Sequence, residues 1–197
     1  MMKNRITFLL VLCCSVLTAF SRTTMREMIS SMPDSVLPLL TQVNRVDCID
    51  FREADMQARV TNRMGGTTEL TALTDVFALW QYTEATVYEM RLLPVNDSTS
   101  VLCVVHTVLT PVPDSEISFY SESWAPIPSG NFVSLVSADD EWARRELSLS
   151  ADTDTLSVTL HKETYVMNED ETASVVSSSI PYLYVWSGSR FVSLASE

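Results

Sequence analysis

Residues 155–161, with the sequence TLSVTLH, alternate strictly between polar and apolar side chains. Leu156, Val158 and Leu160 occupy every second position of this stretch. Because successive side chains of a β-strand point to opposite faces of a sheet, the alternation predicts a strand with one buried face and one solvent-facing face. The period of two, rather than the 3.6 of a helix, makes this stretch the clearest strand in the sequence.

The same period of two extends over most of the chain beyond residue 55. Turn signals interrupt it about every ten residues, a pattern typical of an antiparallel sheet. Gly65 and Gly66 mark one such turn, because glycine supplies the positive φ that a tight hairpin needs. Further strands are predicted over 58–62, 67–73, 78–82, 86–93, 101–109, 116–124, 182–186 and 190–194.

The first third of the chain has helical spacing instead. Thr24 and Glu27 form the pattern of a capping box, which predicts a short helix that ends before Pro33. A second helix is expected over 35–43, and a third is expected to begin at a cap on Asn44.

Two short helices are expected to interrupt the strands, one at 138–142 and one over 168–176, because acids gather at their first positions. The order of elements predicts an α+β fold, with short N-terminal helices followed by a large antiparallel β-sheet with short helical insertions. A single domain over 22–197 is expected. The segment 125–131 is rich in proline and is where a split into two lobes would fall.

The N-terminus has the features of an export signal. Lys3 and Arg5 precede an uncharged run over 6–20. The small residues Ala19 and Ser21 occupy positions −3 and −1 of a cleavage site after Ser21, so residues 1–21 are predicted to be a signal peptide. The run is shorter than the roughly 20 residues of a membrane-spanning helix, and no later stretch is longer. We therefore expect an exported protein, periplasmic or cell-surface/secreted, with no transmembrane segment in the mature chain. Cys13 and Cys14 leave lipidation open as an alternative.

The chain is strongly acidic, with 13 Lys+Arg against 25 Asp+Glu and a net charge of −12. Residues 1–21 contain two of the bases and no acid, so the remainder carries a net charge of −14. The longest run of basic residues after the signal peptide is the pair Arg144 and Arg145. Nucleic acid is excluded as a partner, because phosphate binding needs a cationic surface.

Outside residues 1–21 the cysteines are Cys48 and Cys103. An even pair in an oxidising compartment permits one disulfide. Each cysteine also lies in an apolar stretch, where a free thiol packs as a small hydrophobic side chain. Both alternatives remain open from the sequence.

No familiar catalytic or metal-binding pattern occurs in the chain. There is no G-x-S-x-G motif, and Cys103 and His106 lie three apart on a predicted strand, so they point to opposite faces. Two histidines without paired spacing do not make a zinc site. We expect no catalytic residue, no metal and no cofactor. Paired carboxylates among the 25 acids are the alternative, but the sequence does not say which two converge.

Aromatic residues follow two predicted strands. Tyr182, Tyr184 and Trp186 share one face of the first strand, and Tyr120 and Trp124 share one face of the second. Such ladders stack on sugar rings or hold peptides when exposed. The alternative is that the same face is covered by helices or forms a second layer of core.

Several segments together resemble a family of secreted Bacteroidales proteins of unknown function. The resemblance implies an envelope location in a Gram-negative cell, and the family has no known catalytic residues to carry over. The segments that carry it are 32–41 (MPDSVLPLLT), 44–51 (NRVDCIDF), 60–63 (VTNR), 73–75 (LTD), 90–94 (MRLLP) and 184–192 (YVWSGSRFV).

The leading hypothesis from the sequence is an exported envelope protein that acts as a non-catalytic binding or accessory module. Its partner would be an envelope protein, a peptide or a glycan. The alternative is a hydrolase that uses a pair of carboxylates on an envelope or dietary polymer.

Overall fold

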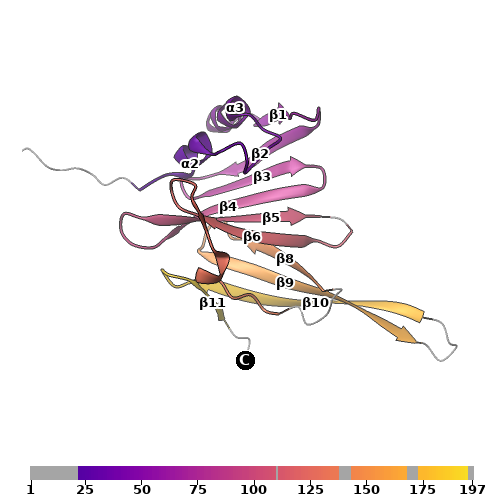
Figure 1. The fold of residues 1–197 in the computed structure, drawn as a ribbon. Coiled ribbons are helices and arrows are strands. Elements are labelled where there is room, and N and C mark those ends of the chain that lie inside the picture. The colour runs from indigo at the N-terminus through magenta and orange to yellow at the C-terminus, as the bar shows by residue number, and fades with distance from the viewer. Residues whose placement is uncertain (1–21, 110, 138–142, 168–172, 195–197) are drawn as a thin grey trace, which may run out of the picture.

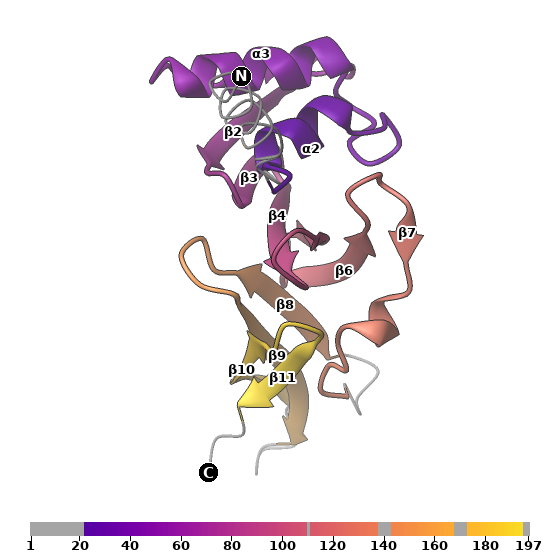
Figure 2. The same cartoon turned by 90° about the vertical axis from the view of Figure 1, so that its left-hand side faces the viewer.

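The computed structural model describes residues 22–109, 111–137, 143–167 and 173–194. The signal peptide predicted at 1–21 and the short helix predicted at 138–142 therefore lie outside the described residues. Two helices, α2 (Met25–Ser31) and α3 (Gln42–Glu53), precede the strands. The helices lie at one end of the molecule and a second sheet lies at the other, with the first sheet between them (Figure 1, Figure 2).

The capping box predicted for α2 is confirmed, since the Thr24 hydroxyl accepts from the Glu27 amide and the Glu27 carboxylate accepts from the Thr24 amide. The cap predicted at Asn44 is wrong. Thr41 caps α3, and Asn44 is its partner three residues later, accepting from the Thr41 amide with its side chain. The helix therefore begins three residues before the position that the sequence indicated.

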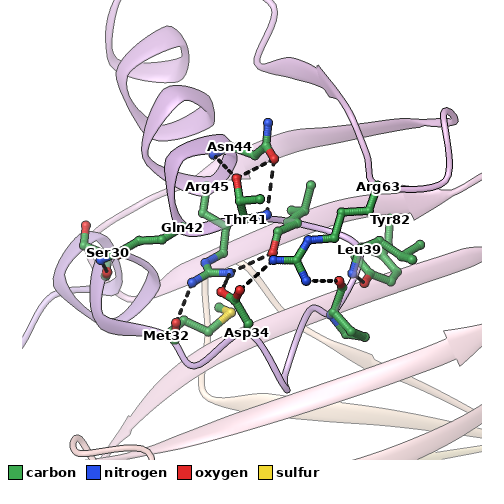
Figure 3. Close-up of polar contacts among 12 residues, drawn as sticks. Ser30, Met32, Asp34, Leu39, Thr41, Gln42, Asn44, Arg45, Arg63 and Tyr82 are labelled. Carbon is green, nitrogen blue, oxygen red and sulfur yellow. Dashed lines mark hydrogen bonds and ion pairs between the residues drawn. The ribbon is translucent and has the colours of Figure 1, made fainter.

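The helix predicted over 35–43 is also wrong, because residues 34–40 form turns. Charged side chains from elsewhere hold this segment in place (Figure 3). The buried guanidinium of Arg45 donates to the carbonyls of Met32 and Leu40 and to the Asp34 carboxylate, at 2.9 Å for the last. Arg63 donates to the same carboxylate at 2.7 Å. These bonds favour the turns, because a buried guanidinium needs acceptors close around it.

The first sheet has seven strands in chain order, and neighbouring strands are antiparallel. Apolar residues on alternate positions, among them Trp80, Met90 and Leu102, pack against Met28 and Ile49 of the helices and form one core. The strands are β1 (Arg59–Thr61), β2 (Thr67–Leu73), β3 (Phe77–Thr83), β4 (Thr86–Pro94), β5 (Ser100–Val108), β6 (Asp114–Tyr120) and β7 (Pro126–Ile127).

The predicted large antiparallel sheet is thus present, but the later strands form a separate sheet of four, in the order β11-β10-β9-β8. The helix predicted over 168–176 is wrong for 173–176, which belong to β10, and residues 168–172 lie outside the described residues. Strand β8 was not predicted. The second sheet comprises β8 (Arg144–Leu149), β9 (Thr155–Met167), β10 (Ala173–Trp186) and β11 (Phe191–Leu194).

A second core lies between the two sheets. It joins Cys103 and Phe119 from the first sheet to Val158, Trp186 and other residues of the second. Residues 125–131 contain β7 and the short 3-10 helix η1 (Ser129–Asn131), after the main strands of the first sheet and before β8. The single domain over 22–197 and the split near 125–131 stay predictions, although both sheets contribute to this core.

Arg91 ties the two sheets together. Its side chain projects from β4 and is almost fully buried. The guanidinium donates to the Asp154 carboxylate at 2.7 and 2.9 Å, and to the carbonyls of Ser150 and Ala151. Since these three acceptors lie between β8 and β9, one side chain fixes that turn of the second sheet to the first.

Candidate functional site

The aromatic side chains predicted to form a binding face are mostly buried. Trp124 and Trp186 are 7% exposed and Tyr184 is 4% exposed. Trp186 donates from Nε1 to the Pro94 carbonyl at 2.7 Å, and the Tyr184 hydroxyl accepts from the Val136 amide at 3.0 Å. The predicted exposed platform is therefore wrong, because the helix-side core buries Trp124 and the core between the two sheets buries Tyr184 and Trp186.

The five aromatic residues also do not converge. Trp124 and Tyr120 belong to the helix-side core, where Trp124 Nε1 donates to the Met28 carbonyl at 3.1 Å. Tyr182, Tyr184 and Trp186 belong to the core between the sheets. Tyr120 and Tyr182 are half-buried, so each lies at the margin of a different core.

The two cysteines are free thiols, so the disulfide permitted by the sequence is wrong. Cys48 lies in α3 within the helix-side core, whereas Cys103 points from β5 into the core between the sheets. Burial raises the pKa of Cys48 to about 12 and raises the pKa of Cys103 well above its ordinary value. Neither thiol is suited to nucleophilic chemistry, which requires the thiolate.

The histidines have separate structural partners. His106 stacks on Tyr88 with ring centroids 4.3 Å apart, and burial lowers the pKa of His106. His106 shares the helix side of the first sheet with Tyr88, opposite to Cys103, as the spacing predicts. Across the described ranges, no three His, Cys, Asp or Glu side chains come together as metal ligands.

His161 bridges three strands of the second sheet, which the sequence did not reveal. Its Nε2 lies 2.9 Å from Glu146 Oε2 on β8, and its Nδ1 lies 3.0 Å from Ser179 Oγ on β10. The order serine, histidine, carboxylate matches that of a nucleophile, a base and an orienting acid. However, Ser179 lies in regular strand rather than on a sharp turn, so we interpret the three as a polar cross-strand ladder.

Two carboxylates line one cleft of about 240 Å³ where β8 crosses the first sheet. Glu89 comes from β4 and Glu146 from β8, over a floor that includes Leu79 and Val87. Burial raises the pKa of Glu89. Its two oxygens accept from the Leu149 amide and from Ser148 Oγ, so Glu89 also bonds the two sheets together.

The same contacts close the free edge of β8. Backbone groups at a sheet edge attract another strand unless they are covered. The Leu149 amide donates to Glu89, the Leu147 amide donates to Ser115 Oγ at 2.9 Å, and the Arg145 amide donates to Asp114 at 3.3 Å. All three acceptors are side chains of the first sheet.

The two edge strands of the first sheet, β1 and β7, are short, which leaves little backbone for another strand to pair with. Strand β1 has three residues, and β7 has two, one of which is Pro126. Short edge strands and proline are common devices against unwanted strand pairing.

The outer side of β10 differs from these three edges. Strand β11 pairs with β10 only from Leu183 to Trp186, so in the part of the chain that the structure describes, no strand lies beside β10 before Leu183. Ser187 donates its amide toward β11 and Trp186 toward the β9 side. Because this direction alternates along a strand, Ser177 and Ser179 direct their amides and carbonyls outward. Pro181 points the same way but has no N–H.

We call the outward backbone of residues 173–181 the open edge. Exposed apolar side chains lie on β10 and β11 beside it. A shallow hollow of about 460 Å³ is lined in part by Pro181, Leu183 and Leu194. The exposed fractions are 38% for Ile180, 40% for Leu183, 49% for Val192 and 54% for Leu194.

Comparison with known proteins identifies relatives but no activity. A family described as "Protein of unknown function (DUF3256)" matches residues 17–191. A solved structure of a domain of an uncharacterized protein from Porphyromonas gingivalis W83 is similar, with 27% sequence identity and a TM-score of 0.68. The similarity covers 89% of this chain and 100% of that chain. No curated protein matches. In the described residues, no helix is long and apolar enough to span a membrane.

Proposed function

The chain belongs to the DUF3256 family of proteins of unknown function, as the resemblance to a Bacteroidales family predicted, and we propose that it is an exported, non-catalytic binding module. Its site is the open edge of β10, and its ligand is an extended strand of a polypeptide partner. The proposal of export is based on the signal peptide predicted at 1–21.

The unequal treatment of the sheet edges carries this proposal. Edges of β-sheets are an aggregation hazard, and proteins usually cover or shorten them. Side chains cover β8 here, and β1 and β7 are short. An edge left open on the same protein, beside the exposed side chains of Leu183 and Leu194, is suited to strand addition.

Strand addition also fits the chemistry of this surface. A peptide that joins a sheet gains main-chain hydrogen bonds, and its alternate side chains find pockets on the sheet face. Ser177 and Ser179 would supply the outward amides and carbonyls. The hollow lined by Leu183 and Leu194 would receive an apolar side chain.

Site-specific photo-crosslinking tests the proposal in cells that export the protein. A photoreactive amino acid at Ile180 or Leu194 is expected to give a discrete crosslinked protein band, identified by mass spectrometry. Val43 is the matched control, because it is an apolar residue 67% exposed on α3, far from the open edge. Equal labelling from Val43 and Leu194, or none from either edge position, would contradict the proposal.

One observation favours a hydrolase as the second candidate. Glu89 and Glu146 line the same cleft, and the pKa of Glu89 is raised by burial, as is common for a general acid. The test is turnover of aryl glycosides by the wild type and by Glu146→Gln. Turnover that is lost in Glu146→Gln would support this candidate, and absence of turnover in the wild-type protein would remove it.

A further inference from the structure

We infer that the partner at the open edge is a second copy of this chain, whose β10 pairs antiparallel with the first. This inference rests on the proposed function, because it names the polypeptide that adds its strand. It is carried by the length of the β9–β10 hairpin, by the charge of the edge and by the symmetry of antiparallel pairing.

The hairpin of β9 and β10 extends beyond the strands on both of its sides. The pairing of β8 with β9 extends only as far as Arg144 and His161. The pairing of β11 with β10 extends only as far as Leu194 and Leu183. Residues 162–167 and 173–178 therefore pair only with each other among the described residues. Figure 1 shows this two-stranded ribbon projecting past the body of the molecule.

A ribbon of two strands is marginally stable in water, and independent stability requires a third strand or a covering layer. Neither of the two helices in the described residues, α2 and α3, covers this ribbon (Figure 1). Pairing β10 with β10 of a second copy makes a four-stranded sheet from two ribbons. The open edge of each copy then lies at the centre of that sheet, where its outward amides and carbonyls are paired.

The charge along the edge favours another copy of the same surface. Residues 173–194 contain one charged residue, Arg190, although the whole chain carries 25 acids and a net charge of −12. Two strongly acidic molecules repel each other over most of their surface. The repulsion between copies is weakest where the charges are absent, which is this edge.

Antiparallel pairing of a strand with its own copy has two-fold symmetry. Such an interface is isologous, so each copy presents the same donors and acceptors to the other, and the β10 edges of both copies are covered. The outward groups of Ser177 and Ser179 fit this arrangement. Pro181 has no N–H and limits the pairing on the side toward β11.

Sedimentation velocity over a range of protein concentrations tests the inference, with Ser177→Pro as the main variant. The Ser177 amide points away from β9, so proline there removes no hydrogen bond within one copy, just as Pro181 is tolerated four residues further along the same strand. The wild type is expected to form a dimer, and Ser177→Pro is expected to raise its dissociation constant at least about tenfold.

A second variant and a control distinguish a weakened interface from a misfolded protein. Ser177→Lys keeps the backbone amide but places like charges at the interface, and it is also expected to weaken the dimer. Val43→Lys on α3 makes the same kind of change at a distant exposed site and is expected to leave the dimer unchanged. Circular dichroism of each variant at low concentration checks the fold.

The outcomes separate this inference from the proposed function. A wild type that stays monomeric at all concentrations, or a dimer that both Ser177 variants leave intact, would overturn the inference. If crosslinks from Leu194 then reach a different protein, strand addition survives with another partner. If the edge positions crosslink to nothing, the proposed function fails as well.

Discussion

The helix-covered end of the molecule and the second sheet close their backbone groups in different ways. At the helix-covered end, the turns of residues 34–40 are held by Arg45, Arg63 and Tyr82, whose hydroxyl accepts from the Leu39 amide at 2.6 Å. In the second sheet, the β8 edge that faces the first sheet is bonded, whereas among the described residues no strand lies beside β10 before Leu183. Buried polar contacts therefore concentrate at the joints of the fold, and the surface proposed for binding has none of them.

This difference separates stability from association. Substitutions at the joints should change the free energy of unfolding and leave the open edge unaffected, whereas substitutions at the open edge should change association alone.

Replacement of Arg45 by methionine should have the largest effect. It leaves the carbonyls of Met32 and Leu40 and one oxygen of Asp34 without their buried donor, at a cost of about 3–5 kcal/mol in the free energy of unfolding. Urea denaturation followed by circular dichroism measures it. Arg59→Met is the control, because its pair with Glu69 is solvent-exposed and is worth about 0–1 kcal/mol. Equal losses in the two variants would refute the importance of the buried contacts.

Replacement of Arg91 by methionine should cost less, about 2–3 kcal/mol, since it removes charge-assisted hydrogen bonds to one turn. The turn between β8 and β9 should then detach first, because Arg91 is its clamp. Limited proteolysis should cut near Ala151 in the variant and not in the wild type. Cleavage that begins in the helices α2 and α3 would contradict this assignment.

The pH dependence of stability should have opposite signs at two carboxylates. Burial raises the folded-state pKa of Glu89, so the wild type loses stability as pH rises through the interval between its unfolded and folded values. Arg45 and Arg63 lower the pKa of Asp34, so its stabilisation is present above the ordinary value and is lost as pH falls through the lowered one.

At pH 7 the free energy of unfolding of Glu89→Gln should therefore be equal to or higher than that of the wild type. The difference between the two should shrink at low pH. Asp34→Asn should be less stable than the wild type at pH 7, and its deficit should also shrink at low pH. Denaturant titrations between about pH 3 and pH 8 measure both differences. Deviations of the same sign at pH 7 would show that one of the two environments is misassigned.

The smallest effect should come from a reducing agent. Because Cys48 and Cys103 are free and lie on opposite sides of the first sheet, reductant should leave Tm unchanged. Both thiols are buried, so an aromatic disulfide reagent should label them only after denaturation. A fall in Tm on adding reductant would show that Cys48 and Cys103 form a disulfide.

The strands that the sequence predicted are those with local signals. The alternation over 155–161 continues into a strand, and Gly65 and Gly66 lie in the turn between β1 and β2. The extension of the β9–β10 hairpin was missed, because the acids at 169–171 are typical of a helix start. Pairing of Ala173 with Met167 overrides that local preference.

The remaining errors come from contacts between distant residues. Helical spacing over 35–43 is overridden by bonds from Asp34 to Arg45 and to Arg63, which are 11 and 29 residues away. The aromatic face was misjudged because alternation shows which side chains share a face and does not show what covers it. For the same reason, the open edge had no signal in the sequence beyond the lack of charge in 173–194.

Amide hydrogen exchange resolved to single residues tests the central claim most directly. Leu147, Leu149, Ser177 and Ser179 all direct their amides away from their own sheet, but only those of Leu147 and Leu149 have acceptors in the described structure. In dilute solution the Ser177 and Ser179 amides should exchange at least about 100-fold faster, and they should become protected as the protein concentration rises. Equal protection of all four amides at every concentration would contradict the open edge.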